Sequence, residues 1–150
     1  MKELIKYLNE GNFSLLCGVP DSLLSELTFA FNLTNKKVLH LKSSSEGSSI
    51  GQAIGAYLST SKPALIYMQN SGLGNCVNPL SSLASKDVYG IPMVLVIGWR
   101  SEIKNGHQIN DEDQHKHQGK ITLEILKLLD IEYKIIDSYE KFFNYLKLYR

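Results

Sequence analysis

Short, nearly continuous apolar runs alternate along the chain with segments in which apolar residues recur at helical spacing. The runs lie at residues 13–17, 38–41, 64–68, 93–97 and 133–136, and turn-forming or polar residues follow most of them. Runs of this length without a polar face are typical of strands that are covered on both sides. The pattern therefore predicts five strands buried on both faces of a sheet.

Between these runs, the spacing of apolar residues predicts helices. Asp21 precedes one of them and is expected to cap it. Another covers residues 46–59, where Gly51 and Gly55 lower helix propensity and so predict that something packs closely against this helix. The helical residues are Leu4, Ile5 and Leu8; Leu23, Leu24, Leu27 and Phe31; Ile50, Ala53, Ile54 and Tyr57; Ile121, Ile125 and Leu128; and Phe142, Phe143 and Leu146.

Strands that alternate with helices favour right-handed crossovers and a parallel sheet. The expected fold is therefore α/β, a three-layer arrangement with a parallel sheet and helices on both faces. The sequence contains no linker-like stretch and no internal repeat, so residues 1–150 are expected to form a single domain.

Composition excludes several classes of protein. Hydrophobic residues make up 43% and charged residues 21% of the chain, which is ordinary for a globular domain and unlike a disordered one. A formal charge of +1 gives no reason to expect a nucleic acid or a membrane as partner. A cytoplasmic location follows by default, because the sequence shows neither a signal pattern nor a membrane-length apolar run. Cys17 and Cys76 are then expected to be reduced.

Polar and turn-forming residues cluster where four of the predicted strands end. They are residues 18–22, 43–47, 69–75 and 98–100. Ligands of open parallel sheets bind beyond the carboxyl ends of the strands. We therefore expect a binding site at this edge.

Glu46 is the sharpest single candidate, because a carboxylate that opens a helix of small residues can approach a flat heterocycle closely. An ordinary charge in a first helical turn is the alternative. Residues 69–75 contain two glycines among hydrogen-bonding side chains, which suits a loop that wraps a ligand. They match neither a phosphate-loop nor a dinucleotide-binding motif, and a structural turn remains the alternative.

The polar segment after the fourth predicted strand offers further candidates. Its histidines and acidic residues match no standard zinc spacing, so no metal site is predicted. A lid that supplies a side chain to a nearby pocket is the better functional interpretation, and His115 could then act as an acid or base. Arg100 could bind a carboxylate or phosphonate through two hydrogen bonds, although many arginines form only surface ion pairs. A serine hydrolase is set aside, because no nucleophile elbow is present.

Several blocks, in order, resemble the thiamine-diphosphate-dependent decarboxylases of the phosphonopyruvate decarboxylase type. They are Gly18-Val19-Pro20-Asp21-Ser22-Leu23-Leu24, Glu46-Gly47, residues 67–75, Val77-Asn78-Pro79-Leu80, Ile97-Gly98-Trp99-Arg100, Asp111-Glu112, Gln114-His115 and Gln118-Gly119. The resemblance spans roughly residues 13 to 120. This part of the chain is similar to the pyrimidine-binding domain of these enzymes. The alpha subunit of sulfopyruvate decarboxylase is a near relative.

The resemblance implies roles for individual residues. Glu46 would hydrogen-bond the aminopyrimidine ring of thiamine diphosphate and share a proton with it, together with Gly18, Pro20 and Asn70 around the cofactor. His115 would handle protons. The implied substrate contacts are Asp21, Ser71, Arg100 and Gln114. The implied reaction converts phosphonopyruvate, a small anionic 2-keto acid, to phosphonoacetaldehyde and carbon dioxide.

The family pattern is incomplete in this chain. No Gly-Asp-Gly motif occurs, although these enzymes use one to hold the diphosphate through Mg²⁺. A diphosphate-binding domain or subunit is therefore the expected partner, in a homo- or hetero-oligomer, and the isolated chain is expected to be inactive. The alternatives are a sulfopyruvate decarboxylase alpha subunit, a non-catalytic interaction or regulatory module that retains the fold, and an unrelated small-molecule binding domain with the same sheet.

Overall fold

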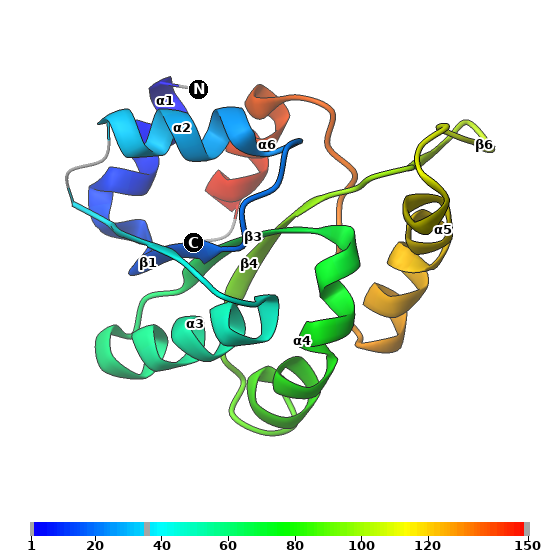
Figure 1. Ribbon diagram of the computed structural model, residues 1–150. Helices are drawn as coiled ribbons and strands as arrows, with labels where there is room; N and C mark the ends of the chain where they lie inside the picture. The colour runs from blue at the N-terminus through cyan, green and yellow to red at the C-terminus, as the bar shows by residue number, and fades with distance from the viewer. Residues whose placement is uncertain (1, 35–36, 149–150) are drawn as a thin grey trace.

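A four-stranded parallel sheet forms the centre of the computed structural model, which describes residues 2–34 and 37–148 (Figure 1). The strands are β1 (Leu15–Gly18), β2 (Leu39–Lys42), β3 (Ala64–Gln69) and β4 (Met93–Gly98), in the order β2-β1-β3-β4. β1 pairs with both β2 and β3, and β3 pairs with β4, always in parallel. All four carboxyl ends therefore lie at one edge of the sheet.

Helices cover both faces of the sheet, which makes three layers (Figure 1). On one face lie α3 (Glu46–Thr60), α4 (Leu73–Pro79) and α5 (Asp113–Leu128), packed around Cys17, Ile66 and Met68. On the other lie α1 (Lys2–Tyr7), α2 (Ser25–Thr34) and α6 (Tyr139–Leu148), around Leu16, Leu65 and Tyr67. Neighbouring strand residues thus point into different cores, as the pleat requires. The predicted three-layer α/β fold is confirmed.

Shorter elements complete the chain. They are η1 (Leu8–Asn12), η2 (Asn70–Gly72), η3 (Leu80–Ala84) and a small antiparallel hairpin formed by β5 (Ile103–Lys104) and β6 (His107–Gln108). Cys17 and Cys76 are both free and buried. Across the described residues, no helix combines the length and apolar character needed to cross a bilayer.

The strands are not equally buried, contrary to the sequence prediction. All residues of β1 are buried, as are those of β3 up to Met68, whereas β2 and most of β4 are only partly covered. The reason is their position, since β1 and β3 are the two central strands of this sheet and β2 and β4 are its outermost strands. Apolar composition does not distinguish a central strand from an edge strand.

The fifth predicted strand, at residues 133–136, is wrong: the segment has no strand pairing in the structure. Ile131 and Tyr133 pack against the core on the α3 face, whereas Ile136 packs against the core on the α1 face. The segment therefore passes from one face of the sheet to the other. Its apolar residues reflect burial on two successive faces rather than a place in the sheet.

Three helix boundaries also differ from the prediction. α2 begins at Ser25 rather than directly after Asp21, whose carboxylate accepts a hydrogen bond from the backbone N–H of Leu23 (3.0 Å) and so caps the preceding turn. The segment at residues 69–75, predicted as a loop, is helical from Asn70 onward. α5 begins at Asp113, which places His115 on a helix instead of in a polar loop.

Candidate functional site

Glu46 is the first residue of α3, directly beyond the end of β2. Ser45 caps this helix by accepting a hydrogen bond from the backbone N–H of Ser48 (3.2 Å). The side-chain amide of Asn75, on α4, donates to Oε2 of the half-buried Glu46 (2.8 Å). No other described residue donates to this carboxylate, so Oε1 is open to a ligand. The cap and the amide together fix the position of one carboxylate oxygen.

Two glycines make room for this arrangement. A Cβ at Gly72 would lie 2.3–2.6 Å from three side-chain atoms of Glu46, and one at Gly47 would lie 2.7 Å from the carbonyl oxygen of Asn75. By contrast, no described residue lies within 4 Å of a Cβ built at Gly51 or Gly55, so the close packing predicted there is not made within the described part of the chain. The glycines that matter are those of the strand-end segments, because α3 and α4 approach each other there.

A second group forms where β1 and β4 end. Asp21 is only 7% exposed, and a Cβ at Gly98 would lie 2.3 Å from its Oδ1. Its Oδ2 is buried and has no hydrogen-bond partner among the described residues. Burial raises the pKa of the Asp21 carboxyl above its usual value, although the backbone N–H groups of the turn and the nearby Arg100 oppose this shift. A buried carboxyl in this state is suited to contact a ligand.

Asn70 joins the ends of β3 and β4 to α5. It is 1% exposed, accepts a hydrogen bond from the backbone N–H of Arg100 (3.2 Å) and donates to the hydroxyl of Thr122 (2.9 Å). Gly119 lets α5 lie close to the segment after β4, because a Cβ at this position would lie 2.2 Å from the carbonyl oxygen of Ser101. Asn70 therefore supports the shape of the site, a structural role in addition to the cofactor contact that the resemblance implies.

Arg100, Asp111 and His115 form an ion-paired cluster beside Asn70. The Arg100 guanidinium donates from Nε (2.8 Å) and Nη2 (2.7 Å) to the two oxygens of Asp111. Nδ1 of His115 lies 3.0 Å from the same carboxylate. The Arg100 hydrogen bonds, followed by those of His115 and the Glu112 backbone, hold the pKa of Asp111 far below its usual range. Asp111 is therefore an anion that organises two of the predicted site residues.

The remaining predicted site residues line the same edge less closely. Ser71 accepts a hydrogen bond from the side-chain amide of Gln69 (2.8 Å). Gly18 ends β1, where a Cβ would lie 2.0 Å from the carbonyl oxygen of Tyr67. Pro20 and Gln114 are exposed. Sequence reasoning missed Asn75 as the partner of Glu46, 29 residues away, and Asp111 as the partner of Arg100, 11 residues away, because such spacings give no signal that two side chains will meet.

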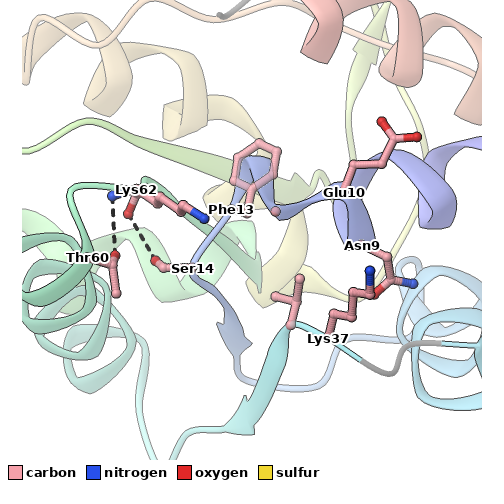
Figure 2. A pocket seen from close by; sticks show the side chains of 9 residues that line it. Asn9, Glu10, Phe13, Ser14, Lys37, Thr60 and Lys62 are labelled. Atoms are coloured by element: carbon pink, nitrogen blue, oxygen red, sulfur yellow. Dashed lines mark hydrogen bonds between the residues drawn. The ribbon is translucent and has the colours of Figure 1, made fainter.

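The hollow in Figure 2 lies at the opposite edge of the sheet. It has a volume of about 440 Å³ and is lined by residues that precede β1, β2 and β3, among them Ser14, Lys37 and Lys62. It is therefore separate from the strand ends that carry Glu46 and Arg100. Among the described residues, no group of three or more histidine, cysteine or acidic side chains gathers where it could hold a metal ion.

Comparison with known proteins identifies the family of this chain. Residues 1–123 match the family model described as the thiamine pyrophosphate enzyme, N-terminal TPP binding domain. The chain belongs to this family. The resemblance found in the sequence is thereby confirmed.

Individual relatives are similarly informative. The chain is 34% identical over 134 residues to a phosphonopyruvate decarboxylase of Streptomyces viridochromogenes, a match that covers 89% of this chain and 32% of that protein. It is 36% identical over 128 residues to the alpha subunit of a sulfopyruvate decarboxylase of Methanococcus maripaludis, covering 85% of this chain and 71% of that subunit. The chain thus spans about a third of the length of the phosphonopyruvate decarboxylase.

The residues at this edge fit the aminopyrimidine part of thiamine diphosphate. A carboxyl group that shares a proton with a ring nitrogen needs an oxygen without a protein donor, and Oε1 of Glu46 meets that requirement among the described residues. Gly47 and Gly72 keep side chains away from the contact between α3 and α4. The described residues gather no comparable set of ligands for a diphosphate-bound metal.

Proposed function

We propose that this chain is the pyrimidine-binding part of a thiamine-diphosphate-dependent 2-keto acid decarboxylase, with phosphonopyruvate as the substrate. The observation that carries the proposal is the Glu46 carboxylate at the end of β2, held by Asn75 through one oxygen. The products would be phosphonoacetaldehyde and carbon dioxide. The 34% identity to the phosphonopyruvate decarboxylase, in a match that covers 89% of this chain, supports this choice of substrate.

The cofactor and the chain would divide the work. Thiamine diphosphate, when bound, supplies an electron sink for the electron pair that remains after a 2-keto acid loses carbon dioxide. Glu46 would hold a proton at its carboxyl oxygen and share it with the pyrimidine ring. Gly18, Pro20 and Asn70 would shape the wall of the cofactor pocket, since they lie in the segments after β1 and β3.

The substrate would bind at the Arg100 side of the same edge. Nη1 of Arg100 has one long hydrogen bond, to the hydroxyl of Ser22 (3.4 Å), and can be directed at a phosphonate or carboxylate. Asp21, Ser71 and Gln114 would line the remainder of the substrate site, and His115 would handle protons as an acid or base. These assignments place the group that binds the anionic end of the substrate next to the group that handles protons.

We further propose that Mg²⁺ and the diphosphate are held by a partner, either a separate domain or a second subunit. The alpha-subunit designation of the sulfopyruvate decarboxylase relatives supports a partner chain. The active site would then form at an interface, and the chain without that partner would turn over no substrate. A cytoplasmic location is consistent with such an enzyme and remains a prediction.

Sulfopyruvate is the second candidate substrate. The favouring observation is the 36% identity to a sulfopyruvate decarboxylase alpha subunit, of which the match covers 71%. Sulfonate and phosphonate groups are both tetrahedral anions, so the same arginine could bind either of them.

Reconstitution tests both substrates. Decarboxylation would be measured with Mg²⁺ and thiamine diphosphate, using this chain alone and mixed with the polypeptide encoded next to it. Turnover of phosphonopyruvate in the mixture alone supports the proposal, and faster turnover of sulfopyruvate selects the second candidate. If the mixture binds thiamine diphosphate but turns over neither acid, the decarboxylase assignment is wrong.

A further inference from the structure

Asp111 contacts more partners than any role as a simple surface charge would require. Its Oδ1 accepts from Nη2 of Arg100 (2.7 Å), the backbone N–H of Glu112 (2.8 Å) and the His115 ring (3.0 Å), and its Oδ2 accepts from Nε of Arg100 (2.8 Å). The side chains of Asp111 and His115 are each 15% exposed, and that of Arg100 is 25% exposed. The cluster is therefore partly shielded from water, where such bonds hold a fixed geometry.

The chemistry of the carboxylate decides which proton His115 carries. A carboxylate can only accept, so Nδ1 of His115 must be the nitrogen that bears the proton. In a neutral imidazole the other nitrogen then has a lone pair and can only accept. Asp111 lies two residues before α5 and His115 lies in the first turn of that helix, so the contact ties the start of α5 to the segment before it.

The same carboxylate also fixes one side of Arg100. It occupies Nε and one hydrogen of Nη2. The Nη1 side of the planar group makes only the long hydrogen bond to Ser22 (3.4 Å) and can take another partner. The backbone N–H of Arg100 is held by Asn70, so the base of this side chain is fixed as well. The guanidinium thus has one direction in which it can still receive an anion.

We propose that Asp111 is a positioning residue, which fixes His115 with its proton on Nδ1 and directs the Nη1 side of Arg100 toward the anionic group of the substrate. Its place at the substrate site rests on the proposed function. The arrangement of the three side chains does not, and it can be tested in this chain alone.

Nitrogen NMR of the histidine rings measures the tautomer directly. The four histidines would be labelled with ¹⁵N, and the His115 signals identified by their loss in His115→Gln. Above neutral pH, where imidazole is uncharged, we expect Nδ1 of His115 to show the shift of a protonated nitrogen and Nε2 that of an unprotonated one. The opposite assignment in the wild-type chain overturns the proposal, without the need for any variant.

Asp111→Asn should disturb this tautomer. Arg100 donates to both carboxylate oxygens, and His115 shares Oδ1 with it, so an amide in either orientation sets its NH₂ group against a donor of Arg100 and the cluster must rearrange. We therefore expect the His115 ring signals to differ from those of the wild-type chain. The matched control is Asp113→Asn, which removes a neighbouring carboxylate that is paired with Lys116 and 97% exposed. We expect the control to leave the His115 signals unchanged. Unchanged signals in Asp111→Asn would also overturn the proposal.

Kinetics in the reconstituted enzyme separates this inference from the proposed function. Misdirecting Arg100 and His115 together should raise KM for the 2-keto acid about 10-fold and lower kcat on the order of 10²-fold in Asp111→Asn, with Asp113→Asn within about twofold of wild type. If the wild-type mixture is inactive but the NMR result holds, the proposed function fails and the tautomer assignment stands. Equal kinetics in both variants would reject Asp111 as a positioning residue for catalysis.

Discussion

The two edges of the same sheet use polar side chains in different ways. At the carboxyl edge, side chains bind other side chains from distant segments, as in Asn75 with Glu46 and Arg100 with Asp111. At the amino edge, Ser14 donates to the backbone carbonyls of Lys62 and Pro63, and it thereby fastens a loop (Figure 2). Side chains that fix one another can hold chemical groups in place. Side chains that bind the backbone mainly stabilise the fold.

Among these substitutions, Glu46→Gln at the carboxyl edge should have the largest effect on decarboxylase turnover. Removing the shared proton from the carboxyl edge should lower decarboxylase turnover roughly 10²–10⁴-fold in the reconstituted enzyme. The control is Glu10→Gln, which removes a carboxylate that lines the hollow at the amino edge and should leave turnover unchanged. Equal effects of both variants, measured by carbon dioxide release, would show that the two edges do not differ in function.

Gly72→Ala should sharpen the comparison next. The new Cβ would lie 2.3–2.6 Å from side-chain atoms of Glu46, so either that carboxylate or α4 must move. We expect a loss of about 1–3 kcal/mol in unfolding free energy, together with reduced thiamine diphosphate affinity in the assembled enzyme. Urea denaturation and cofactor titration measure these effects.

Gly74→Ala is the matched control, two residues along the chain. No described residue lies within 4 Å of a Cβ at this position in α4. The exposed helical alanine should stabilise the chain by roughly 0.5–1 kcal/mol and leave cofactor affinity unchanged. A loss of stability equal to that of Gly72→Ala would remove the explanation based on crowding.

How well the sequence predicted these features depends on whether they are set by neighbouring residues or by residues far apart in the chain. Continuous apolar runs located the four strands, and helical spacing located α1, α2, α3, α5 and α6 but not α4, because these patterns are local. The pattern of apolar runs failed at residues 133–136, where the partly buried Tyr133 and Ile136 pack on different faces of the sheet. Nothing local distinguishes that burial from a strand.

The candidate site was predicted with the same limits. Glu46, Asp21 and Arg100 follow strand ends, so the rule for ligands of parallel sheets was sufficient to find them. The partners Asn75 and Asp111 were not identified as such, because their contacts depend on how α4 and the segment before α5 pack. The distances between elements depend on tertiary packing, and a single sequence indicates that packing only through its resemblance to a known family.

Asp21→Asn should produce a smaller, pH-dependent effect. Burial raises the pKa of Asp21 above its unfolded value, so the native state binds more protons between the two values and stability falls as pH rises through this window. The asparagine side chain in the variant does not titrate in this range, so it makes no such pH-dependent contribution to stability. We therefore expect it to be more stable than wild type at neutral pH and to lose this advantage below about pH 4. Thermal unfolding at both pH values checks the sign, and a constant difference would contradict it.

Lys62→Ala should have the smallest effect. Lys62 is exposed and lines the hollow at the amino edge, where Ser14 binds its backbone carbonyl rather than its side chain. The unfolding free energy should change by less than about 0.5 kcal/mol, and decarboxylase turnover should not change. A large loss of turnover in the reconstitution assay would assign the amino edge a role in catalysis.

The unequal burial of the strands also predicts how the domain opens. Backbone amides in β1 and β3, which have a strand on each side, should exchange with deuterium only when the whole sheet separates. Those of the edge strand β2 should exchange through local opening. Asn70 therefore follows the most protected strand, and Glu46 follows one of the least protected. Slower deuterium uptake in β2 would accordingly be a sensitive signal of a ligand bound at Glu46.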